Sequence, residues 1–227
     1  MAGNAFHAAE PADQSGISRA QGAVFIGILL ALILKTTLDT FFEGIADHNT
    51  LGAVLAVMNK QLAKSVLLVC QLIVFLFALI RFYWGSFRYY QQKPKVEETP
   101  EVAVDLLGAL LLFMSFYVVS LLIRTTSLFY YGLILVNGVD LAWFLLATTH
   151  LALQEGMRKV AGWYILFDVL TVVAVGLTTG ADAIWGPTRF FVFQFLALFA
   201  VLAIGVWDLI KLWSYYKNAP DWQDKLR

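Results

Sequence analysis

Charge is scarce in this chain, and so is cysteine. Of its 227 residues only 14% are charged and 60% are hydrophobic, whereas a soluble domain is about 25% charged and about 45–50% apolar. The single cysteine, Cys70, lies inside an apolar run, so the chain forms no internal disulfide and carries no Cys-rich metal motif. The net charge is zero and no basic stripe is present, which argues against binding to nucleic acid.

Common catalytic and cofactor motifs are also missing. The sequence has no HExxH metal site, no Walker loop, no GxGxxG dinucleotide motif and no GxSxG nucleophile turn. His7 lies in the N-terminal tail, and His48 and His150 are expected on opposite faces of the membrane, so haem ligation by two histidines of one bundle is not expected. We therefore predict no cofactor, no metal site and no enzymatic activity.

Long apolar runs are what the sequence does contain. A run of about 20 apolar residues crosses a hydrocarbon core of about 30 Å as a helix. The runs are continuous rather than alternating, which favours helices over a barrel. The sequence thus predicts an all-α, polytopic membrane protein, a six-helix transmembrane bundle with short loops whose spans cover residues 21–42, 65–87, 102–123, 128–150, 162–179 and 190–213.

This bundle is expected to be one domain, residues 21–213, between a polar N-terminal tail (1–20) and a polar C-terminal tail (214–227). The first apolar run is too long for a signal peptide and is interpreted as a retained span. Residues 50–64 form a short amphipathic stretch that either lies in the interface plane or extends the next span.

Lysine and arginine are distributed unequally between the two predicted sides. The side with both tails has nine of them and the other side has four: Arg19, Arg88, Lys93, Lys95, Arg158, Lys159, Lys217, Lys225 and Arg227 against Lys60, Lys64, Arg124 and Arg189. The positive-inside rule then predicts that both termini are cytoplasmic, in a plasma or inner membrane. The expected partners are the lipid bilayer and either further copies of the chain or a larger membrane complex.

Four ionisable residues are predicted in the inner halves of four different spans. Asp140 and Asp168 lie about 15 Å and about 12 Å from the inner ends of their spans, and Asp208 and Arg81 lie about one to two turns from theirs. Charges inside a membrane normally face a partner or water. One acid can pair with Arg81, so the others must be protonated, hydrated or bridged by a cation.

These residues, with the polar Asn137, are therefore candidates for a proton or cation path. The alternative is a static set of interhelical pairs that fixes the order of the helices, in which Lys211 neutralises Asp208. Asn137 is equally typical of a hydrogen bond between helices.

A second group of charges lies at the outer ends of the spans. Lys35, Asp39 and Glu43 are spaced i, i+4 and i+8 on one face of the first span, and Lys35 is expected to pair with Asp39. With Asp182, at the outer end of the fifth span, they would form a negative outer mouth that concentrates cations. The alternative is a solvated interface face.

Three functional hypotheses follow from these observations. The favoured one is a small cation or proton channel or transporter that uses its buried acids. The second is a non-catalytic scaffold or accessory subunit, which would bind a larger membrane complex through aromatic-rich inner segments, residues 82–90 and 207–216.

The third hypothesis is an intramembrane aspartyl-type enzyme. Asp140 and Asp168 lie on adjacent spans at similar depth, and two carboxylates that share a proton are the aspartic-protease arrangement. This loosely resembles intramembrane aspartyl proteases, but their Tyr-Asp and Gly-x-Gly-Asp patterns are not met in order or in full, and no Pro-Ala-Leu element is present. It is the least favoured of the three.

Overall fold

The computed structural model describes residues 14–43, 62–92, 99–150, 155–185 and 190–217. Within these ranges the chain forms seven helices and no strand, which confirms the all-α prediction for the described residues. The helices are α1 (Gln14–Glu43), α3 (Leu62–Gln92), α4 (Thr99–Leu122), α5 (Thr126–His150), α6 (Glu155–Trp185), α7 (Phe190–Lys211) and the short α8 (Trp213–Tyr216). Most of the predicted amphipathic stretch, like His48, lies outside the described residues.

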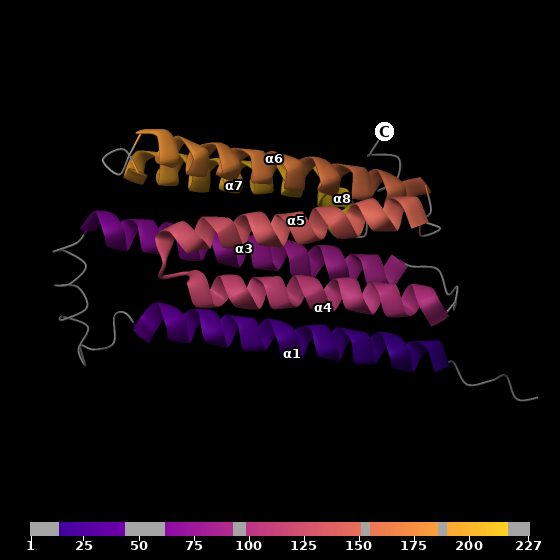
Figure 1. The fold of residues 1–227 in the computed structure, drawn as a ribbon. Helices are drawn as coiled ribbons and strands as arrows, with labels where there is room; N and C mark the ends of the chain where they lie inside the picture. The colour runs from indigo at the N-terminus through magenta and orange to yellow at the C-terminus, as the bar shows by residue number, and fades with distance from the viewer. Residues whose placement is uncertain (1–13, 44–61, 93–98, 151–154, 186–189, 218–227) are drawn as a thin grey trace, which may run out of the picture.

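The six long helices lie side by side and run in alternating directions along a common axis (Figure 1). α1 packs against α3 and α4, α5 packs against α4 and α6, and α7 packs against α6 and α3, so the helices close into a ring. The start of α1 and the short helix α8 lie at the same end of this ring (Figure 1). We call it the α8 end, and the opposite end the far end.

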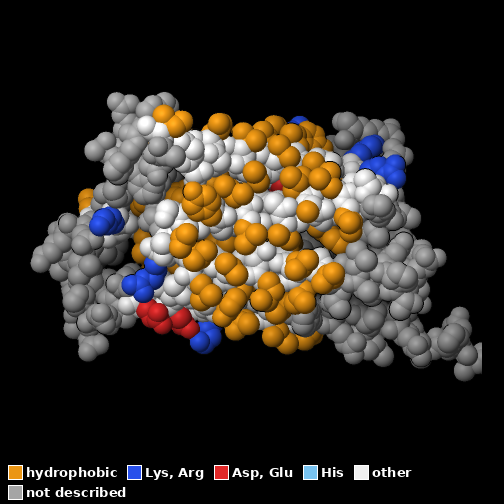
Figure 2. Space-filling view, in the orientation of Figure 1, with side chains coloured by type: hydrophobic (Ala, Val, Ile, Leu, Met, Phe, Trp, Pro, Cys, Tyr) orange, Lys and Arg blue, Asp and Glu red, His pale blue; other side chains and the backbone are white. Residues whose placement is uncertain are grey.

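Four described segments are long and apolar enough to cross a membrane: Lys64–Arg88, Ser127–Thr149, Gly156–Gly180 and Val192–Lys211. The other two predicted spans, residues 21–42 and 102–123, fall almost entirely within α1 and α4. Six crossings therefore remain a prediction. On the face seen in Figure 2, apolar side chains are spread over the surface between the two ends, and most of the visible charges lie toward the ends. Such a surface is compatible with an integral membrane location.

The interior is packed with large apolar side chains over most of its length. Phe75 of α3 and Phe116 of α4 are buried and meet edge to face, with ring centroids 5.9 Å apart. Gly132 brings α5 close to α4, because a Cβ atom there would lie 2.8 Å from Cγ2 of Val119. Close contact at glycine is a common way to pack helices where lipid provides no hydrophobic drive.

A buried acidic cluster and two pockets as the candidate functional site

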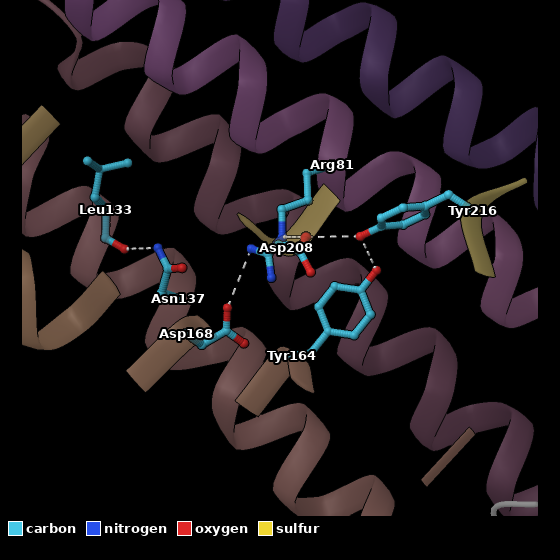
Figure 3. Close-up of polar contacts among 7 residues, drawn as sticks. All are labelled: Arg81, Leu133, Asn137, Tyr164, Asp168, Asp208 and Tyr216. Atoms are coloured by element: carbon cyan, nitrogen blue, oxygen red, sulfur yellow. Dashed lines mark hydrogen bonds and ion pairs between the residues drawn. The ribbon is translucent and has the colours of Figure 1, made fainter. Parts of the chain in front are cut away.

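Arg81 of α3 lies at the centre of a buried cluster in the half of the bundle nearer the α8 end (Figure 3). Its Nε donates a hydrogen bond to Oδ2 of Asp208 on α7. Its Nη1 lies 3.6 Å from Oδ1 of Asp168 on α6. Both carboxylates are fully buried and the Arg81 side chain is 13% exposed. The arginine therefore joins three helices through one guanidinium group.

Two tyrosines extend this cluster through a chain of hydroxyl hydrogen bonds (Figure 3). The Tyr216 hydroxyl donates to Oδ2 of Asp208 at 3.1 Å. The Tyr164 and Tyr216 hydroxyl oxygens are 2.6 Å apart. Because the proton of Tyr216 is used toward Asp208, Tyr164 must be the donor to Tyr216. The order of donation thus runs from Tyr164 through Tyr216 to Asp208, which Arg81 approaches from another side.

The position of Tyr216 depends on the end of α7. Leu212 is buried between α7 and α8, and the Tyr216 amide continues the helical pattern by donating to the Leu212 carbonyl at 2.9 Å. Arg88 of α3 then donates from Nε to the Tyr216 carbonyl at 2.8 Å. Two arginines two turns apart on α3 therefore fix α7 and α8.

Asp140 of α5 completes the set of three acids around Arg81. Its side chain is nine-tenths buried and interacts electrostatically with Arg81, Asp168 and Asp208. None of the three ion pairs found among the described residues includes Asp140. Neither carboxylate oxygen of Asp168 has a hydrogen-bond partner within the described part of the chain. Three acids thus surround one base, and Asp140 is the least directly compensated.

Asn137 lies one helical turn from Asp140 on α5 and is also buried. Its side-chain Nδ2 donates to the Leu133 carbonyl of its own helix at 2.8 Å (Figure 3). This leaves the amide oxygen of Asn137 as an acceptor inside the bundle. Lys211, by contrast, does not pair with Asp208: it is exposed and lies over the Trp163 ring, 5.4 Å from its centroid.

A pocket opens beside the cluster between α3, α4, α5 and α6. It encloses about 700 Å³ of empty space, part of which is open to the surroundings. Arg81, Asp140, Ser86 and Tyr164 are polar members of its wall. Aromatic rings form much of the remainder, namely Phe82, Trp143, Phe144 and Tyr215. An apolar pocket with a few convergent polar groups is the usual form of a small-molecule site.

Two glycines bring the rings to this pocket. A Cβ atom at Gly108 of α4 would lie 2.7 Å from two ring atoms of Trp143. A Cβ atom at Gly85 of α3 would meet the Tyr164 hydroxyl. Phe144 stacks on the Tyr164 ring, with ring centroids 4.8 Å apart. The pocket wall is therefore closely packed around Trp143 and Tyr164.

A smaller pocket lies at the far end, between α5, α6 and α7. Its wall includes Ser127, Tyr130, Thr178, Thr179 and Gln194. The Tyr130 hydroxyl donates to the backbone carbonyl of Gln194 at 3.1 Å. Both side-chain amide atoms of buried Gln194 have no hydrogen-bond partner within the described residues. Buried polar atoms of this kind are normally satisfied by water or by a ligand.

The predicted outer-mouth residues are separate from the buried cluster. Lys35 and Asp39 pair as expected, with Nζ 2.6 Å from Oδ2, and their side chains are 73% and 54% exposed. Glu43 is exposed at the end of α1. Asp182 lies in α6, and its side chain is outside the described set. The negative mouth remains a prediction, although its first ion pair is confirmed.

The structure thus brings together Arg81, Asp140, Asp168 and Asp208, as the similar predicted depths suggested. Sequence reasoning did not include Tyr164, Trp143 or Gly85 in the site. Tyr164 stands four residues before Asp168, so helical spacing alone would have placed both side chains on one face. Asp140 and Asp168 do meet, but Arg81 stands beside Asp168, so the two acids are not an isolated pair.

No protein-family model, no curated protein and no solved structure matches the chain. Its function is therefore inferred from the geometry of the site.

Proposed function

We propose that the chain is a small proton-coupled membrane transporter in which Asp140 and Asp168 exchange the proton or cation. The observation that carries this proposal is the cluster of three acids around a single arginine, buried among four helices and reached by a pocket. A static network would be expected to balance its charges, because an uncompensated buried charge is costly. Here the acids outnumber the base, and the excess suits groups that take up and release a positive charge.

Two pockets at opposite ends, with a packed layer between them, favour a transporter over an open pore. Asp140 is in the wall of one pocket and Gln194 is in the wall of the other. Between them the core contains buried apolar side chains, namely Leu133, Val136, Val175, Ala197 and Leu198. Passage across this layer requires the helices to move, which is how alternating access is achieved in transporters.

The residues of the cluster have distinct roles in this proposal. Asp140 faces the pocket and exchanges the positive charge with it. Asp168 shares the proton or cation with Asp140 inside the bundle. When the proton or cation leaves, Arg81 compensates the negative charge of the Asp168 carboxylate. Asp208 is the fixed member, because Arg81 and Tyr216 both donate to one of its oxygens. Three different environments for three acids are the usual basis for separating such roles.

The membrane arrangement that belongs to this proposal has six spans, with both tails in the cytoplasm of a plasma or inner membrane. The start of α1 and the helix α8 lie at the same end of the bundle, which supports an even number of crossings (Figure 1). The larger pocket would then open toward the cytoplasmic half of the bilayer. The smaller one, beside Gln194, would open toward the outside.

Proton and cation flux into liposomes tests the proposal. Wild-type protein is expected to dissipate an imposed gradient, whereas Asp140→Asn and Asp168→Asn should each reduce the rate by at least about tenfold. Asp140→Glu is the matched variant that keeps the carboxylate, and it should retain part of the rate. Undiminished flux in the folded Asp140→Asn protein, or no flux in the folded wild type, would refute the proposal.

A scaffold function is the second candidate, and one observation favours it. Trp84, Trp207 and Trp213 are exposed, and all three residues lie in the half of the bundle nearer the α8 end. Such rings suit either a lipid interface or a protein partner. Purification from the native membrane in mild detergent distinguishes the two functions. The scaffold would be favoured if a companion protein co-purifies in stoichiometric amount and no flux is measured with or without it.

A further inference from the structure

We propose that the larger pocket binds an organic cation, with its positive head beside Asp140 and its apolar body among the rings of Trp143 and Phe144. This inference rests on the proposed transport function and names its substrate class. The observations that support it are the chemical composition of the pocket wall, the Asp140 carboxylate, which belongs to none of the ion pairs among the described residues, and the close packing at two glycines.

Charge complementarity selects a cation over an anion. Arg81 is also in the pocket wall, but its guanidinium group is already engaged by Asp208 and Asp168. Asp140 is nine-tenths buried, lies in the same wall and belongs to none of the ion pairs among the described residues. A cation entering the pocket therefore gains a carboxylate partner. An anion would find only Nη2 of Arg81 without a hydrogen-bond partner, and it would meet the three surrounding acids.

The aromatic rings provide a second source of affinity for a cation. Trp143, Phe144, Tyr164 and Tyr215 all contribute to the wall. Aromatic faces attract ammonium groups, and cages of such rings are the common way to recognise quaternary ammonium ions. The Tyr164 ring already holds the Arg81 guanidinium 5.1 Å from its centroid. The rings of Trp143 and Phe144 have no such cation in the described residues.

The shape of the pocket wall depends on Gly108 of α4. Gly108 keeps Trp143 in place, because a methyl group there would collide with the indole ring. A Gly108→Ala change should therefore displace Trp143 and alter the pocket without changing any charge.

Calorimetric titration of the detergent-purified full chain with benzyltrimethylammonium tests the proposal. We expect saturable binding to wild type, and weaker binding of phenylmethanesulfonate, which has a similar size and opposite charge. Asp140→Asn should raise the dissociation constant by about tenfold, the effect of losing one favourable charge contact. Trp143→Leu should raise it about threefold to tenfold.

Two control variants make the result specific to the pocket. Trp207→Leu removes an exposed tryptophan of α7 that is not in the pocket wall, and should leave the dissociation constant unchanged. Gly108→Ala should weaken binding, whereas Gly176→Ala, with open space around its Cβ position, should not. These variants also report folding, because a general loss of folded structure would weaken binding in all three.

The outcomes separate this inference from the proposed function. Binding that depends on Asp140 but is accompanied by no flux would support the organic-cation site and refute transport. Proton flux that depends on Asp140 without saturable binding of benzyltrimethylammonium would support transport and overturn the organic-cation site. Equal or stronger binding of phenylmethanesulfonate would also overturn it, since Arg81 would then be the recognised group.

Discussion

Arg81 with Asp208 and Lys35 with Asp39 are the same kind of ion pair in opposite surroundings. The first pair joins α3 to α7, and its carboxylate is fully buried. The second lies within one helix, i to i+4, with both side chains more than half exposed. Burial makes the loss of one partner costly, because the other charge is left without solvent or counter-ion. The exposed pair lies toward the far end of α1, and where water reaches it the same loss is almost free, because water replaces the partner.

The first way to test this comparison is to remove the buried base. Arg81→Gln should lower the free energy of unfolding by about 3–5 kcal/mol, because Asp168 and Asp208 would lose their cation. Lys35→Gln, the same loss of charge in the exposed pair, should leave the unfolding midpoint unchanged within error. Titration with a denaturing detergent measures both. An equal, small change in the two variants would mean that the cluster is hydrated and not buried.

The all-helical fold and the similar depth of the four charged residues in the cluster could be predicted from the sequence, because both follow from the length and spacing of apolar runs. The partners of Arg81 could not be predicted in this way. α3 lies between α1 and α7, although it follows α1 and precedes α4 in the chain. In a lipid environment both faces of a helix are apolar, so hydrophobic periodicity does not mark which face turns inward. Only the packed structure shows that Arg81 pairs with Asp168 and Asp208 and not with another acid.

The pocket is a further feature that sequence alone does not predict. Gly85 and Gly108 are recognisable as small residues, but their importance depends on Tyr164 and Trp143, which belong to other helices. By contrast, the Lys35–Asp39 pair was predicted correctly because both residues lie on one helix at a fixed spacing. Contacts within a helix can be predicted from spacing, whereas contacts between helices require the order of the ring.

A smaller effect is expected from the hydroxyl chain that belongs only to the buried region. Tyr216→Phe removes the donor to Asp208 and the acceptor of Tyr164. Because one of these bonds involves a carboxylate, the free energy of unfolding should fall by about 1.5–3 kcal/mol. Tyr131→Phe, at an exposed tyrosine of α5, is the matched control and should show no loss. A stable Tyr216→Phe protein would show that water can replace this hydroxyl, and that the cluster is open to solvent.

The smallest effect belongs to the exposed region, and it should appear only in transport at low salt. If Asp39 and Glu43 concentrate cations at the far end, the double variant Asp39→Asn/Glu43→Gln should raise the half-saturating cation concentration by about twofold near 0.01 M ionic strength, where the Debye length is about 30 Å. At 1 M salt the Debye length falls to about 3 Å and the difference should disappear. Unfolding should be unaffected at either concentration. An effect that persists at 1 M salt would mean that these acids contact the transported ion directly, and the contrast between a buried working cluster and a screened outer surface would then fail.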